Sequence, residues 1–197
     1  MRRRTFDALM VVAGLALAAI MLVAGGLLTW GHVFTNNEVK TQLVAQKIVF
    51  PPAGSPAITA LPKADAAAMT VYAGQTMTTG AQAQTYADHF IRVHLIEIGG
   101  GLTYSQLSAK AMAAPANTKL AAQVETVFKG TTLRGMLLNA YGFGQMGQIA
   151  WFGAIAAFAG AALLLILSLF GVWHLRRAPE TAEVFPKVAH AVKVQTA

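Results

Sequence analysis

The stretch from Ile149 to Val172, IAWFGAIAAFAGAALLLILSLFGV, contains no ionisable side chain. A helix rises about 1.5 Å per residue, so a run of this length crosses a hydrocarbon core about 30 Å thick. The run is apolar on all sides, whereas a core helix of a soluble protein needs only an apolar stripe. Trp151 lies near its start, and Trp173 and the pair Arg176-Arg177 follow its end, as is typical of membrane interfaces. The stretch predicts a transmembrane helix over residues 148–175.

A second apolar run extends from Ala8 to Trp30 and follows the basic residues Arg2–Arg4. A cleaved signal peptide is the alternative interpretation, but its apolar region spans only about 7–15 residues and ends at a small-residue cleavage site. This run is longer, and the residues after Trp30 make a poor cleavage site. We therefore expect a short N-terminus over residues 1–7 and an uncleaved transmembrane helix over residues 8–30.

The basic residues at the two ends predict the topology. Positive residues stay on the cytoplasmic side, so Arg2–Arg4 place the N-terminus inside and Arg176-Arg177 place the end of the second helix inside. The two predictions agree only if residues 31–147 are extracytoplasmic. The sequence thus predicts a multi-pass protein of the cytoplasmic (plasma) membrane, with both termini cytoplasmic and a disordered cytoplasmic tail over residues 176–197.

Composition excludes several classes of protein. The chain has no cysteine, which excludes disulfide frameworks, zinc fingers, iron–sulfur sites and CxxCH haem attachment. Its formal net charge is +7, but the basic residues are not clustered with aromatic residues as in a nucleic-acid binder. We expect the lipid bilayer, and no nucleic acid, as a partner.

The segment over residues 31–147 shows no convincing alternation of apolar and polar residues, so we expect a small all-α domain. Thr35 and Glu38 form a capping-box pattern for a helix over residues 36–48, which can also continue the first transmembrane helix. The prolines between Pro51 and Pro62 then predict a stiff connector, with polyproline docking on a partner as the alternative.

Four further helices are predicted before the membrane. Thr79-Gly80 opens the first, which runs to Ile98 and ends at Gly99–Gly101. Thr103 caps a helix that carries Leu107, and Pro115 ends it. Asn117 or Thr118 then caps a helix that ends at Gly130, and Thr131 or Thr132 begins a last amphipathic stretch.

Two apolar stripes are predicted to pack together as the core of this domain. They consist of Tyr86, Phe90 and Val93 on one helix and Leu120, Val124 and Phe128 on another. Arg92 falls on the opposite side of its helix, where we expect it to be exposed.

The most specific functional hypothesis is a metal site, with Asp88, His89, His94 and Glu97 as the candidate ligands. His89 and His94 are five residues apart and diverge on a helix, while His94 and Glu97 share a face but supply only two ligands. Asp88 and Arg92 have the spacing of an ordinary i,i+4 ion pair. The sequence predicts no metal-ligating, cofactor-binding or catalytic residue.

Two other motifs are also interpreted as structural. Gly99–Gly101 are interpreted as the end of a helix, because a helix precedes them. A phosphate-binding loop would need a strand before it and a Lys and a Ser/Thr within it. Ser105 and Ser108 lack the GxSxG pattern of a nucleophile elbow.

Small residues form stripes on both predicted spans: Gly14, Ala18 and Gly25 on the first, and Gly153, Ala156, Ala157 and Gly160 on the second. Such residues let helix backbones approach closely in a membrane. The stripes fit two interpretations, packing of the two spans against each other and contact with another membrane protein.

Several motifs carry a resemblance. They are Tyr72-Ala73-Gly74-Gln75, Thr79-Gly80-Ala81-Gln82-Ala83, Tyr86-Ala87-Asp88-His89-Phe90 and Gly99-Gly100-Gly101-Leu102-Thr103-Tyr104-Ser105. With the apolar span after Tyr141, they resemble a family of small actinobacterial two-span membrane proteins of unknown function. Some of its members are labelled aromatic ring-opening dioxygenase. That chemistry needs a set of His and carboxylate ligands, and the predicted topology separates His89 and His94 from His174 and His190.

The sequence therefore predicts a non-enzymatic integral membrane protein, an accessory or scaffolding component of a membrane or cell-envelope complex. An oxidoreductase or dioxygenase-like membrane enzyme and a lipid or small-molecule carrier are the alternatives.

Overall fold

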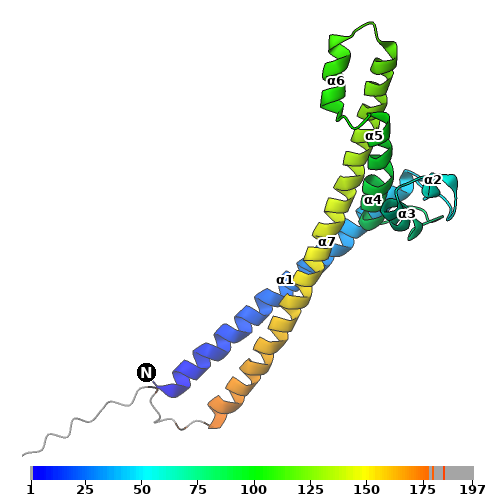
Figure 1. Ribbon diagram of the computed structural model, residues 1–197. Coiled ribbons are helices and arrows are strands. Elements are labelled where there is room, and N and C mark those ends of the chain that lie inside the picture. Colours follow the sequence, from blue (N-terminus) through cyan, green and yellow to red (C-terminus); the bar gives the residue numbers. More distant parts are fainter. Residues whose placement is uncertain (1, 178, 180–183, 185–197) are drawn as a thin grey trace, which may run out of the picture. The chain divides into compact units, whose positions relative to one another are not determined.

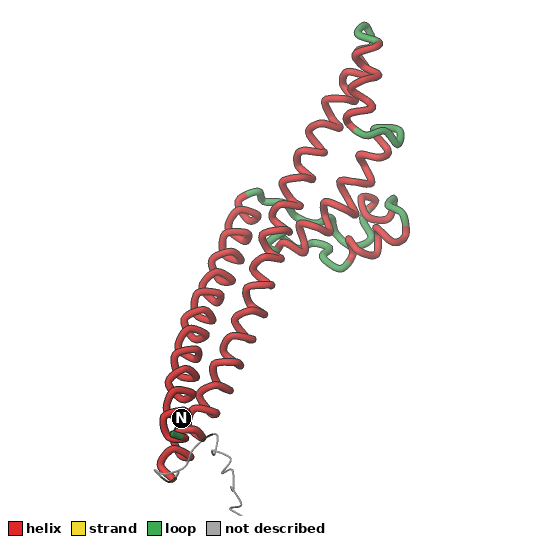
Figure 2. The backbone as a smooth tube through the Cα atoms, turned by 90° about the vertical axis from the view of Figure 1, so that its left-hand side faces the viewer, coloured by secondary structure: helices red, strands yellow, loops and turns green. Residues whose placement is uncertain are grey.

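The computed structural model describes residues 2–177, 179 and 184, and most of the predicted tail over 176–197 lies outside these residues. The described backbone consists of helices joined by loops (Figures 1 and 2). The helices are α1 (Arg3–Ala45), α2 (Pro56–Thr59), α3 (Lys63–Thr70), α4 (Gly80–Tyr86), the π-helical turn η1 (Ala87–Ile91), α5 (Arg92–Ile98), α6 (Tyr104–Ala113) and α7 (Thr118–Arg177). No strand is present in this part of the chain, so the all-α prediction is confirmed.

The chain forms two compact units. One, the paired-helix unit, comprises Met1–Thr29 and Phe152–Ala197, and the other, the helical unit, comprises Trp30–Trp151. The long helices α1 and α7 each contribute residues to both units.

In the paired-helix unit, α1 and α7 are both long and apolar enough to cross a membrane. Only 17% of the most apolar window of each helix is buried, whereas the core helix of a soluble protein is mostly buried. Large apolar side chains such as Val23, Leu27 and Leu169 are more than half exposed. Two long apolar helices thus flank the smaller helical region, as predicted.

Both long helices extend further than their predicted spans. Helix α1 passes through Thr35 without a cap, so the capping-box prediction is wrong and the alternative, a continuation of the first apolar helix, is correct. Helix α7 likewise passes through Gly130 without ending. Glycine lowers helix stability by only about 1 kcal/mol, and a Cβ at Gly130 would collide with the side chain of Leu95. This glycine permits close packing and does not end the helix.

The core of the helical unit differs from the predicted core. Tyr86, Phe90 and Val93 pack against a buried cluster that draws on α1, residues 50–77, the α4–η1 segment and one residue of α7: Val39, Leu43, Phe50, Ile58, Leu61, Met69, Met77, Ala83, Ala87, Ile91 and Leu137. Leu120, Val124 and Phe128 are not in it, and Phe128 instead packs on Tyr104 with ring centroids 5.3 Å apart.

The segment after Pro51 supplies much of this core, so its interpretation as a stiff connector is wrong. Pro56 lies at the start of α2, where a proline costs no hydrogen bond, and Pro62 directly precedes α3. The amide nitrogens of Phe50 and Met77 donate to the carbonyl oxygens of Gln75 and Ile48, each at 2.9 Å. These prolines begin helices and fold the segment back on itself.

The predicted helix from Thr79-Gly80 to Ile98 is present and consists of α4, η1 and α5. Thr79 and Gln82 form a capping box at its start. At its end, Gly100 and Gly101 have φ of 59° and 79°, the left-handed conformation that glycine adopts without cost. The predicted caps of the next two helices are confirmed at Thr103, with Leu107 buried, and at Asn117, whose Oδ1 accepts from the amide of Leu120 at 3.0 Å.

The π-turn keeps one face of this helix on the core. Ala83, Ala87 and Ile91 are buried and Leu95 is partly buried against the same cluster. In a regular α-helix, side chains four residues apart are offset by roughly 40° around the axis, so the offset from Ala83 to Leu95 would reach roughly 120°. A single π-turn accommodates one extra residue, which reduces this offset by roughly 100° and so leaves Leu95 on the same face as Ala83.

Candidate functional site

The four candidate metal ligands do not converge. His94 Nδ1 lies 2.7 Å from the carbonyl oxygen of Phe90 in its own helix, and Glu97 is exposed. Within residues 2–177, 179 and 184, no group of three His, Cys, Asp or Glu side chains is placed to hold a metal ion.

Asp88 and His89 instead belong to an ion-pair network in the helical unit. Arg134 Nη2 of α7 lies 2.6 Å from Asp88 Oδ1, and His89 Nδ1 lies 2.7 Å from Asp65 Oδ1 of α3. Arg92 Nη2 lies 3.5 Å from the same Asp65 oxygen. The network therefore joins α3, the η1–α5 segment and α7.

The predicted ion pair between Asp88 and Arg92 is wrong. Arg92 Nε donates to the backbone carbonyl of Asp88 at 2.8 Å, while the Asp88 carboxylate pairs with Arg134. Tertiary partners replace the local pair, because the Asp88 carboxylate meets Arg134 of α7 and the Arg92 guanidinium lies near Asp65 of α3.

Three side chains of this network are sheltered from solvent, whereas His89 and Arg92 are 36% and 45% exposed. The exposed fractions are 14% for Asp65, 28% for Asp88 and 32% for Arg134, against 66% and 72% for the surface pair of Glu125 and Lys129. Exposed pairs contribute roughly 0–1 kcal/mol, whereas removing one partner of a sheltered pair costs more. We interpret the network as a clamp between helices.

Sequence reasoning missed Asp65 and Arg134. Asp65 is 24 residues from His89, and Arg134 is 46 residues from Asp88. No local spacing relates these residues, so only the tertiary fold brings them together.

Small residues in the paired-helix unit face the neighbouring helix. A Cβ on Gly25 would lie 2.8 Å from Phe158, and one on Gly14 would lie 2.5 Å from the Ser168 hydroxyl. By contrast, no atom lies within 4 Å of a Cβ placed on Gly26. Of the two interpretations of these stripes, packing of the two helices against each other is the one that this unit displays.

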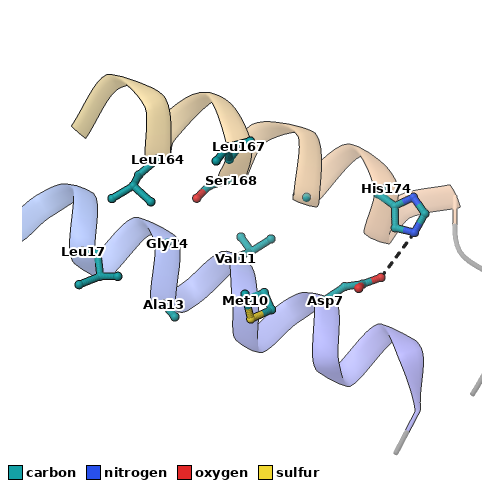
Figure 3. Close-up of a pocket in the computed structure, with 11 residues that line it drawn as sticks. Asp7, Met10, Val11, Ala13, Gly14, Leu17, Leu164, Leu167, Ser168 and His174 are labelled. Atoms are coloured by element: carbon teal, nitrogen blue, oxygen red, sulfur yellow. Dashed lines mark ion pairs between the residues drawn. The ribbon is translucent and has the colours of Figure 1, made fainter. Parts of the chain in front are cut away.

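A pocket of about 300 Å³ lies between α1 and α7 in this unit (Figure 3). Figure 3 shows Asp7 and His174 pointing toward each other at one end, with Asp7 Oδ2 3.7 Å from His174 Nε2. Asp7 Oδ2 is buried and has no hydrogen-bond partner. The rest of the lining is mostly apolar, including Leu17 and Leu164. The pair marks where the ionisable ends of the two apolar helices meet.

The helical unit also carries an apolar groove of about 440 Å³ between α1 and α7. Four exposed apolar side chains line this groove, namely Phe34, Met136, Phe143 and Met146. Their exposed fractions are 53%, 63%, 58% and 62%. The sequence analysis did not identify this groove, because no local spacing relates Phe34 of α1 to the three residues of α7.

Comparisons of the chain with protein-family models, with curated proteins and with solved structures found no significant match. They therefore leave the family resemblance untested.

Proposed function

We propose that this protein is a two-span, non-enzymatic membrane protein whose helical unit holds a helix of another membrane protein in the apolar groove. The observation that carries the proposal is the groove itself, with Phe34, Met136, Phe143 and Met146 at its rim. Exposed apolar patches of this kind mark interaction surfaces, and methionine adapts readily to an irregular partner.

The groove fits a partner helix better than a polar ligand. From Gly135 to Trp151, α7 has no charged residue and no histidine, so the α7 wall of the groove carries no charge. Glu38 is the only charged residue in the lining.

The proposal also specifies on which side of the membrane the termini and the helical unit lie. Arg2–Arg4 and Arg176-Arg177 favour cytoplasmic termini, and the helical unit is then extracytoplasmic. Single cysteines at Lys119 and at Thr196, which lies outside the described residues, test this with a membrane-impermeant thiol reagent on intact protoplasts. Labelling is expected at position 119 only, and labelling at position 196 only would invert the topology.

Site-specific crosslinking tests the docking role. A photoreactive amino acid replaces Phe143 in the groove, or Phe128 as a control that is 52% exposed on the same helix. In native membranes, position 143 is expected to form one discrete protein adduct that Met136→Glu abolishes, while position 128 forms none. Equal adducts at both positions, or none at 143, would refute docking in the groove.

A lipid carrier is the second candidate, because the same groove has room for part of an acyl chain. In that case the adduct at position 143 would contain lipid and no protein. Mass spectrometry of the adduct separates the two roles.

A further inference from the structure

A second hollow of the helical unit is polar. It has a volume of about 450 Å³ and lies between α1, the start of α4 and α7. Its walls include Asn36, Asn37 and Lys40 from α1 and Gln145 and Gln148 from α7. It shares only Val39 with the apolar groove.

Close backbone packing fixes the floor of this polar pocket. A Cβ on Gly80 would lie 3.0 Å from the carbonyl oxygen of Ala140 and from Tyr141 Cα. A Cβ on Gly144 would lie 3.5 Å from Gly80 Cα. The start of α4 therefore rests directly on the α7 backbone.

One wall is held in place, Thr78 and Thr79 are bonded to Gln82, and three other polar side chains are available to a ligand. Asn36 Nδ2 lies 3.2 Å from the His32 ring nitrogens, and that ring stacks on Trp151 with centroids 5.1 Å apart. Among the described residues, the side chains of Lys40, Gln145 and Gln148 form no hydrogen bond or ion pair with another residue.

The chemistry of the lining indicates the ligand class. Carboxamides both donate and accept hydrogen bonds, as hydroxyl groups do. Lys40 supplies one positive charge, and no acidic residue lines the pocket. The volume falls within the range of small-molecule sites, about 300–1,000 Å³. We propose that this pocket binds a hydroxyl-rich small molecule that carries one anionic group, such as an inositol phosphate or a hexose phosphate.

Both a lipid headgroup and a free polyol phosphate present this chemistry. Asn36 follows Trp30 by six residues and Gln148 precedes Trp151 by three, which are rises of about 9 Å and about 5 Å along a helix. If these tryptophans lie at the membrane interface, the pocket is within reach of a lipid headgroup. The inference uses a different surface from the apolar groove and does not depend on docking there.

The test uses the full-length protein in nanodiscs. The soluble probes are myo-inositol 1-phosphate and glucose 6-phosphate, titrated in phosphatidylcholine nanodiscs and followed by calorimetry. The lipid probe is phosphatidylinositol, with phosphatidylglycerol as a lipid of equal charge without a ring, and native mass spectrometry measures which one the protein retains. The variants are Lys40→Ala and Gln148→Ala. The controls are Lys119→Ala and Asn139→Ala, which remove exposed α7 residues outside the pocket.

We expect saturable binding of a soluble probe, or retention of phosphatidylinositol over phosphatidylglycerol, and these two results identify the source. Lys40→Ala is expected to weaken binding about tenfold or more, because it removes a charge-assisted hydrogen bond. Gln148→Ala is expected to weaken it less, and the two controls to leave it unchanged. No binding of either kind, equal retention of both lipids, or equal loss in the controls would overturn the proposal.

Discussion

Replacing Phe50 by alanine tests the observed core most directly. Phe50 is 1% exposed and precedes the proline-rich segment that the sequence analysis placed outside the core. Its ring centroid lies 5.4 Å from that of Tyr72 and 5.3 Å from that of Tyr86, the second pair being edge to face. The substitution therefore removes a buried ring together with two aromatic contacts.

The expected cost follows from burial. A phenylalanine buries roughly 150–250 Å², which at about 25 cal/mol per Å² corresponds to roughly 4–6 kcal/mol. Measured losses for Phe→Ala in protein cores are about 3–5 kcal/mol, and we expect a value in that range. With a urea dependence of about 2 kcal/mol per molar, the unfolding midpoint of the helical unit should fall by roughly 2 M.

Pulse proteolysis of the full-length protein in mild detergent over a urea series measures this midpoint. Phe128→Ala is the matched control, because that ring is 52% exposed and lies outside the core cluster. We expect the control to lose less than about 1 kcal/mol, as exposed positions usually do. If Phe50→Ala unfolds at the urea concentration of the wild type while Phe128→Ala does not, residues 50–77 are not part of the core.

Three further predictions concern packing, charge and pH. Gly25→Leu should lower the thermal stability of the paired helices in detergent by about 1–3 kcal/mol through overpacking, whereas Gly26→Leu, in open space, should not; equal effects would show that the two helices do not pack through Gly25. Arg134→Ala should destabilise the helical unit more than Lys129→Ala does in the same proteolysis assay. We expect Lys129→Ala to lower the free energy of unfolding by less than about 0.5 kcal/mol, and a larger loss for Lys129→Ala than for Arg134→Ala would contradict the role of the network as a clamp. Burial raises the pKa of Tyr86, so the free energy of unfolding should fall as the pH rises from the ordinary tyrosine pKa to the raised one. The Tyr86→Phe variant should lack this part of the fall. If the variant and the wild type lose the same stability at alkaline pH, the Tyr86 hydroxyl is not buried.

The features that could be predicted from the sequence depend on local signals. The two apolar helices follow from uninterrupted hydrophobic runs, and the caps at Thr79, Thr103 and Asn117 follow from short spacings. Local signals were not always decisive, because the capping-box pattern at Thr35 and Glu38 lies inside α1 and does not begin a helix.

The core and the ion-pair network could not be predicted, for three physical reasons. Prolines were taken as breaks although Pro56 begins a helix. Glycines were taken as ends although Gly130 allows close packing inside a helix. Asp65 and Arg134 reach their partners only through the tertiary fold, and the sequence carries no record of that proximity.

The π-turn at Ala87–Ile91 makes residue number as important here as residue type. Inserting one more residue into this turn would rotate everything after it by roughly 100°, whereas deleting one residue would restore an ordinary helical turn with the same faces. After an insertion every side chain of α5 would remain, yet Leu95 would leave Gly130 and Arg92 would leave Asp65. A gain in length would thus act as a change in angle, so this segment should tolerate the loss of one residue more readily than the gain of one.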